Sequence, residues 1–392
     1  MCPCPSYDSI LVSCADGRLL TIVIPSDLLL SDKDGWAGEL ELADVHQVHT
    51  GPILQVQALP GEGAAVSIDP SGVILAWSLI SCQCIASLRM FSGLPTADEA
   101  ATAIAARGCG RLIAAGSRSG GVAIFDMSTI SNRKCVFWSR LDMTPVVAIA
   151  AHPSLPVVCV AFQSNCVVFL SITPAATCII GRSFTDTPID ALHWFDSGTP
   201  GHVLLLLHDS SLLRMACPPH DTPHSIHCTA SLETFAPIRL PLSDIISGLS
   251  GHVSVLTCRL VVSEHYDSSM LILSQMQRRR RRCRRRLYMH CAGYVDKTSG
   301  GAVPALALTR SVSIRLQILS VPSAGDFAPG SFSILSRGQC SRRIVALAVS
   351  NDVQRLAVGC SDGSIAVADV RDAVTAYEFV RRHDGASLGC SR

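Results

Sequence analysis

One short pattern recurs along this chain: an apolar run, a small residue, a turn rich in Gly, Asp or Asn, and a second apolar run. Two apolar runs joined by such a turn predict a β-hairpin, because Gly, Asn and Asp tolerate the positive φ of tight turns. The clearest copies are residues 10–23, 64–77, 112–126, 157–170, 203–214 and 355–369.

The spacing of the copies indicates a fold. Successive turns lie roughly 45 to 55 residues apart over the first five copies, similar to the roughly 40–45 residues of a propeller blade. The interval before the last copy has room for two more, with turns expected near Asp267 and Arg310–Ser311. The turn centres are Gly17, Gly72, Gly120, Asn165, Ser210 and Gly363.

Further strand-like segments flank the hairpins. They lie upstream at 49–56, 143–153, 188–194 and 343–350 and downstream at 83–88 and 376–380. Four strands per copy form one antiparallel sheet. We therefore expect an all-β propeller of seven four-stranded blades, with eight as the alternative. We expect one domain over residues 1–392, with loop insertions near 217–245 and 275–300.

The first copy is expected to lack its upstream strand, because only five residues precede Ser6. Either the tail at 385–390 supplies that strand, so that the two termini share a blade, or the chain is a fragment.

The second copy resembles the WD-repeat family most closely. His49 and Gly51 stand at the family's Gly-His region, and Asp69 and Gly72 stand in the turn. The resemblance covers roughly residues 6–382 and implies a WD-repeat propeller. The Trp-Asp position holds Trp77–Ser78, Phe125–Asp126 or Ala368–Asp369, so no copy has a literal Trp-Asp pair. We therefore expect the family's network of His, Ser or Thr, Asp and Trp to be incomplete.

The composition limits the class of protein and the cellular compartment. The chain is 48% hydrophobic and 16% charged, with a mean hydropathy of +0.36, which argues against disorder. No apolar run reaches the ~18 residues of a membrane span, and no secretory signal stands at the amino terminus. We expect a cytoplasmic, reduced protein with free thiols, and a nuclear location as the alternative. Cys14 and Cys360 occupy the same place in their copies and read as small buried residues.

Positive charge is concentrated in one segment, and the remaining residues are net negative. Such a run binds phosphates or acts as a nuclear address. It is also consistent with a solvated insertion between two blades, which we favour because Tyr288 is the only nearby stacking aromatic. The run consists of Arg278, Arg279, Arg280, Arg281, Arg282, Arg284, Arg285 and Arg286.

A second cluster combines thiols and imidazoles, the groups that zinc prefers. Its prolines at 218, 219 and 223 favour a loop connecting two blades, and no standard finger spacing is met. We therefore expect no metal and no other cofactor. The cluster consists of Cys217, His220, His224, His227 and Cys228.

No catalytic signature stands out. Residues 116–120 resemble a nucleophile elbow, but they lie on an expected hairpin, whereas the elbow needs a strand followed by a helix. His152 precedes Pro153 and is expected to cap a blade turn. We therefore expect a non-enzymatic platform.

The leading function is an intracellular scaffold that binds other proteins through propeller faces and loops. One alternative is a regulator of a small GTPase, because residues 343–385 resemble a late blade of the ER-membrane exchange factors for the COPII-coat GTPase. Another is an RNA-associated assembly factor that uses the arginine run. A ciliary or flagellar propeller has no residue that favours it.

Overall fold

The computed structural model describes the chain in part, and all structural statements concern these residues. They are 2–3, 9–23, 41–59, 64–78, 83–91, 99–106, 112–127, 134–152, 155–173, 177–194, 201–209, 211–218, 237–241, 254–262, 269–277, 313–321, 333–340, 344–349, 355–360 and 365–369.

The described elements are almost all strands, and they form seven sheets, here lettered A to G in chain order. Within each sheet, every strand pairs antiparallel with the strand that precedes or follows it in the sequence. Sheet A contains β1 (Cys2–Pro3), β2 (Ser9–Ser13), β3 (Arg18–Val23) and β4 (Glu41–Gln47); sheet B contains β5 (Gln55–Leu59), β6 (Ala64–Ile68), β7 (Val73–Ser78) and β8 (Cys84–Arg89). Sheet C contains β9 (Ala101–Ala106), β10 (Leu112–Ser117), β11 (Gly121–Asp126) and β12 (Lys134–Arg140); sheet D contains β13 (Val146–Ala151), β14 (Val157–Phe162), β15 (Cys166–Ile172) and β16 (Thr177–Phe184).

The remaining sheets follow the same order, although the last has three described strands. Sheet E contains β17 (Ile189–Trp194), β18 (His202–Leu207), β19 (Ser211–Ala216) and β20 (Ile238–Pro241). Sheet F contains β21 (Ser254–Val262), β22 (Ser269–Gln277), β23 (Ser313–Val321) and β24 (Ser333–Cys340), and sheet G contains β25 (Ile344–Val349), β26 (Arg355–Cys360) and β27 (Ile365–Asp369).

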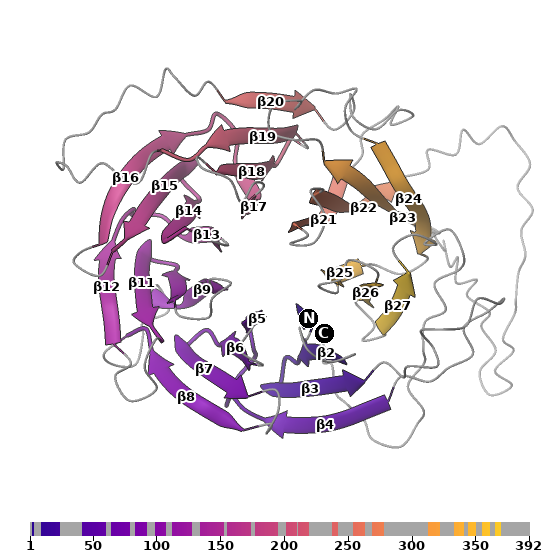
Figure 1. The fold of residues 1–392 in the computed structure, drawn as a ribbon, viewed down its shortest axis with the longest axis horizontal. Coiled ribbons are helices and arrows are strands. Elements are labelled where there is room, and N and C mark those ends of the chain that lie inside the picture. Colours follow the sequence, from indigo (N-terminus) through magenta and orange to yellow (C-terminus); the bar gives the residue numbers. More distant parts are fainter. Residues whose placement is uncertain are drawn as a thin grey trace, which may run out of the picture.

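The sheets stand around a central axis, with the first strand of each sheet innermost and the fourth at the rim (Figure 1). Each inner strand contacts the inner strand of the next sheet, and β1 contacts both β5 and β25. The inner strands therefore follow one another in a closed circle. This arrangement confirms the expected all-β propeller of antiparallel four-stranded sheets.

Two sequence predictions need correction. The first copy does have an upstream strand, since β1 pairs with β2. The expected turns near Asp267 and Arg310–Ser311 do not mark two copies, because the described strands between β20 and β25 form only sheet F. Both positions lie outside the described residues, in connections between strands of that sheet.

The predicted hairpin turns have the geometry that their residues suggested. Gly17, Gly72 and Gly120 have φ values of 85°, 75° and 81°, and Asn165 has a φ of 66°. These values lie in the left-handed region, which glycine enters freely and asparagine enters more readily than other residues. Each of the first four hairpins is therefore closed by a residue suited to its backbone conformation.

The same four residues join each sheet to its neighbour. The carbonyl oxygens of Gly72, Gly120 and Asn165 accept backbone hydrogen bonds of 2.9, 3.0 and 2.9 Å from the start of the connection to the next sheet. The end of that connection bonds to the next sheet in turn; for example, Gln163 N lies 2.9 Å from Pro145 O. We call the side of the ring formed by these turns (14–17, 69–72, 117–120 and 163–165) and connections (48–54, 90–91, 99–100, 141–145 and 185–188) the turn face.

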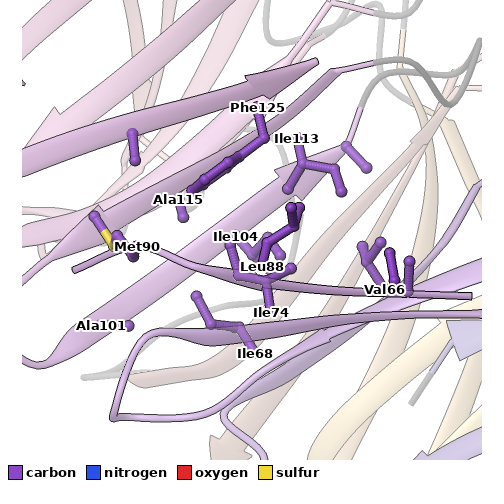
Figure 2. Close-up of a cluster of buried hydrophobic side chains, with 14 of the residues drawn as sticks. Val66, Ile68, Ile74, Leu88, Met90, Ala101, Ile104, Ile113, Ala115 and Phe125 are labelled. Carbon is purple, nitrogen blue, oxygen red and sulfur yellow. The ribbon is translucent and has the colours of Figure 1, made fainter. Parts of the chain in front are cut away.

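The core lies between neighbouring sheets, because the middle strands bury side chains on both faces. Ile68 and Ile74 of sheet B pack against Ile104, Ile113 and Phe125 of sheet C (Figure 2). Each of these side chains is at most 2% exposed. Burying a branched or aromatic side chain of this kind stabilises a fold by about 1.5–3 kcal/mol relative to exposure.

The rim strands carry irregularities that protect their free edges. In sheets A, B, C, D and F the pairing between the third and fourth strands shifts register once. Such a β-bulge bends an edge strand and disrupts the regular row of backbone groups that another strand would need. The rim strands are therefore poorly suited to pairing with a strand of another molecule.

Candidate functional site

In sheet B the turn face is held by a buried chain of polar side chains. His49 Nδ1 lies 2.9 Å from Asp69 Oδ2, and His49 Nε2 lies 2.8 Å from Ser67 Oγ. Trp77 Nε1 donates to the same Ser67 oxygen at 3.2 Å. All four residues are buried. The expectation of an incomplete network is thus wrong for this sheet, where all four members are present and joined; we call them the His49 network.

The hydrogen bonds of the His49 network form one consistent order. The Asp69 carboxylate can only accept, so His49 donates through Nδ1 and accepts the Ser67 hydroxyl proton at Nε2. That leaves the Ser67 oxygen free to accept from the indole of Trp77. The other Asp69 oxygen accepts from Ser71 Oγ at 2.6 Å and from Val73 N at 3.1 Å. The imidazole is thus fixed on both sides and serves as a structural link.

Sheet D replaces this network with a smaller one around Asp142. Its Oδ1 accepts from Thr144 N and Thr144 Oγ1, both at 2.8 Å, and its Oδ2 accepts from Ser164 Oγ at 3.0 Å. Burial raises the pKa of Asp142, but these hydrogen bonds outweigh it and leave the pKa below its ordinary value. The carboxylate therefore ties the connection 141–145 to the turn 163–165.

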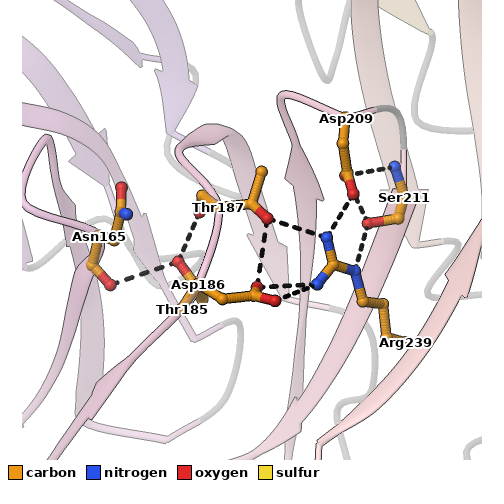
Figure 3. A network of polar contacts seen from close by, with 7 residues as sticks. All are labelled: Asn165, Thr185, Asp186, Thr187, Asp209, Ser211 and Arg239. Atoms are coloured by element: carbon orange, nitrogen blue, oxygen red, sulfur yellow. Dashed lines mark hydrogen bonds and ion pairs between the residues drawn. The ribbon is translucent and has the colours of Figure 1, made fainter.

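Sheet E uses an arginine from the rim (Figure 3). The guanidinium of Arg239, on β20, donates to both Asp186 oxygens at 2.8 and 2.6 Å and to Thr187 Oγ1 at 2.9 Å. It also donates to Asp209 Oδ2, while its Nε donates to Ser211 Oγ at 2.9 Å. One side chain thus joins the connection before β17 to the turn between β18 and β19; we call this the Arg239 network.

The Arg239 network predicts an acid-sensitive contribution to stability. Hydrogen bonds from Arg239 hold the pKa of Asp186 below its ordinary value. Burial raises the pKa of Asp209, but Ser211 and Arg239 outweigh it and lower the pKa overall. A lowered carboxyl pKa stabilises the fold at pH values above the unfolded value of about 4, and this contribution is lost as pH falls through the folded value.

Accordingly, Arg239→Met should lower the free energy of unfolding more at pH 7 than at pH 3. Methionine keeps much of the apolar packing of the side chain, so the change removes mainly the charge and its hydrogen bonds. Urea unfolding at the two pH values measures the effect, with Arg89→Met on the exposed end of β8 as the control. A loss for Arg239→Met that is equal at both pH values would contradict the prediction.

Three large apolar side chains of sheets C and D are exposed at or near the turn face. Met143 is 78% exposed, Phe184 68% and Trp138 55%. Met143 lies in the connection 141–145, while Trp138 and Phe184 lie near the ends of β12 and β16 that lead into the turn face. Trp138 pairs with Ala123, which packs against sheet B, whereas Phe184 pairs with Cys166, which packs between sheets C and D. Met143 and Phe184 are therefore the exposed apolar residues at the junction of sheets C and D.

Three exposed arginines lie on the same two sheets. Arg118 lies in the turn between β10 and β11, and Arg140 Nε donates to the neighbouring Ser119 O at 2.7 Å. Arg182, on β16, donates through Nη2 to Leu141 O at 3.1 Å, which bridges β16 to the connection 141–145. We call the exposed residues at the junction of these two sheets the C/D margin; it consists of Met143, Arg182 and Phe184.

Free thiols occur on both the surface and the interior. Burial raises the pKa of Cys217 to about 12 and of Cys166 to about 11, and it raises the pKa of Cys135 more modestly. Since the thiolate is the reactive form, a buried thiol with a raised pKa reacts slowly.

Brief treatment with a maleimide should therefore modify the exposed group before the buried group. Peptide mapping by mass spectrometry measures the order, and the same treatment in urea should modify both groups alike. Rapid native labelling of Cys159 would contradict the described burial, because that side chain is 0% exposed. The exposed group is Cys84, Cys135 and Cys178, and the buried group is Cys14, Cys159, Cys166, Cys217 and Cys360.

The structure places only some of the residues singled out in the sequence. The arginine run, Arg278–Arg286, lies outside the described residues, between β22 and β23, which pair with each other. It therefore belongs to a connection within sheet F and not to one between two sheets. Cys217 is buried at the end of β19, and its partners in the expected cluster lie outside the described residues. The predicted insertion at 217–245 includes strand β20.

The expectations for two further sites are confirmed. His152 is buried, its Nδ1 accepts from Leu155 N at 2.8 Å, and its ring meets that of Trp194 edge-on at 4.6 Å. It thus caps the turn between β13 and β14. Residues 116–120 lie on the β10–β11 hairpin. No group of three potential metal ligands occurs in the described part, and none of its helices is long and apolar enough to cross a bilayer.

Comparison with known proteins supports the fold. No protein-family model matches the chain, and no curated protein does either. Among solved structures, U3-55K matches with a TM-score of 0.58 at 14% identity, over 91% of this chain and 86% of that one. The RRP9 WD40 repeats match with a TM-score of 0.57 at 14% identity, over 91% and 85%. The β-propeller domain of Cps50 (Swd1) from Myceliophteria thermophila matches with a TM-score of 0.56 at 15% identity, over 86% and 89%.

These similarities and the sheet arrangement define the class: the chain has the fold of the WD-repeat β-propellers. The complete His49 network in sheet B agrees with the resemblance found in the sequence.

Proposed function

We propose that this protein is a non-enzymatic scaffold that binds other proteins through the turn face of its propeller. The observation that carries this proposal is the C/D margin, where the side chains of Met143 and Phe184 are 78% and 68% exposed. Exposed large apolar side chains next to polar ones are typical of protein interaction surfaces.

The hydrogen bonds of the turn face indicate that its buried polar groups have a structural role. The His49 network, the Asp142 carboxylate and the Arg239 network are each saturated by hydrogen bonds that join a connection to a turn. Groups held in this way orient the backbone and are poorly placed to exchange protons with a substrate. What the turn face offers to a partner is therefore its exposed side chains.

Site-specific photo-crosslinking tests the proposal. A benzophenone side chain placed at Met143, in the full chain in cells, should crosslink to one or a few defined proteins. The matched control is the same group at Gln83, which is exposed at the start of β8, at the opposite end of that strand from the turn face. Crosslinks at Gln83 that equal those at Met143, or none at Met143, would count against the turn face as the binding surface.

The second candidate, an RNA-associated assembly factor, is favoured by the eight arginines of the 278–286 run. Because β22 and β23 pair directly, the connection between them can be shortened without removing either strand, and long loops are tolerated or lost at small entropic cost. Replacing residues 278–312 with a short Gly-rich turn should abolish salt-sensitive RNA binding if the run is responsible. RNA binding that survives the replacement would exclude this role.

The third candidate, a regulator of a small GTPase, stays a prediction from the sequence. Of the segment 343–385 on which it rests, the structure describes only β25, β26 and β27.

A further inference from the structure

A threonine followed by proline stands on the turn face, within the Arg239 network. Thr187 and Pro188 lie in the connection between β16 and β17, outside any described strand. Thr187 is half-buried, and the residues on either side of it, Asp186 and Pro188, are exposed. Figure 3 shows the Thr187 hydroxyl between Asp186 and Arg239. The hydroxyl therefore lies on a surface connection, the kind of segment that an enzyme can reach in a folded protein.

One of the contacts of this hydroxyl is a cation. Arg239 Nη2 donates to Thr187 Oγ1 at 2.9 Å, and Thr187 Oγ1 donates to Asp186 Oδ1 at 3.2 Å. A guanidinium matches the geometry of a phosphate and binds it through charge-assisted hydrogen bonds. A phosphate attached to Thr187 Oγ1 would therefore form next to a group that binds phosphate well.

Arg239 is shared by two carboxylates, so it is open to competition from a stronger anion. Its guanidinium contacts both Asp186 and Asp209, and these side chains are 74% and 44% exposed. A phosphothreonine carries a charge of about −1.5 to −2 at pH 7 and has three acceptor oxygens. It would compete with both carboxylates for one guanidinium and repel them. The link between the connection 185–188 and the turn between β18 and β19 would then loosen.

A second Thr-Pro pair on the turn face has different contacts. Thr144 precedes Pro145, and its Oγ1 donates to Asp142 Oδ1 at 2.8 Å and accepts from Ser164 N at 3.0 Å. These partners are a carboxylate and a backbone amide, and neither is a cation. The two pairs therefore share a sequence but not a phosphate-binding neighbour, which makes Thr144 a matched control.

We propose that Thr187 is a phosphorylation site for a proline-directed protein kinase, and that the phosphate takes Arg239 from Asp186 and Asp209. Thr187 Oγ1 forms a bond to the γ phosphorus of ATP, the bond from that phosphorus to the β–γ bridging oxygen breaks, ADP leaves, and the kinase takes up the hydroxyl proton. The modification adds negative charge to the surface that we propose for partner binding. The site and its test do not depend on that function.

The first test is incubation of the full chain with Mg²⁺, ATP and a proline-directed kinase, followed by peptide mapping by mass spectrometry. Phosphate should appear at Thr187 without denaturant. Thr187→Ser should keep the phosphate at this position and Thr187→Val should lose it, whereas Thr144→Val should leave its incorporation at Thr187 unchanged. Absence of phosphate at Thr187, or its appearance only in urea that unfolds the chain, would overturn the proposal.

The second test is phosphorus NMR of the phosphorylated chain, which examines the contact with Arg239. A nearby cation favours the doubly charged phosphate, so the second pKa of the phosphothreonine should be lower in the wild type than in Arg239→Met. The corresponding proton should dissociate roughly tenfold more readily in the wild type. Arg89→Met, on the exposed end of β8, should leave this pKa unchanged. Equal pKa values in the wild type and Arg239→Met would overturn the contact.

A third measurement needs no substitution and so avoids any loss of folding in Arg239→Met. The phosphorylated chain should unfold at a lower urea concentration than the unmodified chain, because Asp186 and Asp209 lose their shared partner and face a new negative charge. An unchanged urea midpoint would overturn the proposed release of the two carboxylates.

Discussion

Gly120→Ala should destabilise the protein strongly even though it adds a single methyl group. A Cβ at this position would lie 2.1 Å from Asp142 O and 2.8 Å from Thr144 O, so the connection 141–145 would have to move. The φ of 81° is also unfavourable for alanine. The backbone conformation alone accounts for about 1–3 kcal/mol, and displacing the connection adds to it.

Gly51→Ala is the matched control, because no atom lies within 4 Å of a Cβ at Gly51 and its φ is not positive. Its free energy of unfolding, from urea denaturation monitored by tryptophan fluorescence, should stay within about 0.5 kcal/mol of the wild type. Equal losses for the two variants would show that the close approach of Gly120 to the connection is not what stabilises this region.

His49→Ala should lower the free energy of unfolding by about 2–4 kcal/mol, because it leaves the buried Asp69 carboxylate without its imidazole partner. The His49 side chain is fully buried and that of Asp69 is 5% exposed. The protein contains its own control in the pair of His208 and Asp190, which are 75% and 45% exposed at 3.2 Å. An exposed pair contributes only about 0–1 kcal/mol.

The His49→Ala loss should also be non-additive with Ser67→Ala, since both residues belong to one chain of hydrogen bonds. A double-mutant cycle measured by urea unfolding gives the coupling. A loss for His49→Ala no larger than for His208→Ala would mean that the His49 network does not stabilise the fold.

The hairpins were predictable because the signal for them is local. A residue that tolerates positive φ between two apolar runs specifies both the turn and its pairing. Gly17, Gly72, Gly120 and Asn165 all have the expected conformation. The prediction of hairpins failed in sheet F, because a long connection separates β22 from β23 and removes the regular spacing. Position along the sequence then no longer indicates which strands pair.

The turn face was only partly predictable, for a different reason. His49, Asp69 and Trp77 could be found by their resemblance to a known repeat, whereas Arg239 could not. Its partners Asp186 and Asp209 precede it by 53 and 30 residues, and β20 is too short to show an alternating pattern. The repeated Thr-Pro before β13 and β17 was a usable signal, because in both places it marks a connection on the turn face.

The position of β1 between β5 and β25 has a consequence for biosynthesis. β1 leaves the ribosome long before β25, so it has to wait for that strand before the circle can close. Contacts so far apart in the sequence form slowly, because much chain entropy is lost before they are made. Sheets B to E, each built from consecutive strands, can form while the chain is still growing. Until β25 is synthesised, the nascent protein is an open arc whose two end sheets lack a neighbour, the stage at which a chaperone has the most to bind.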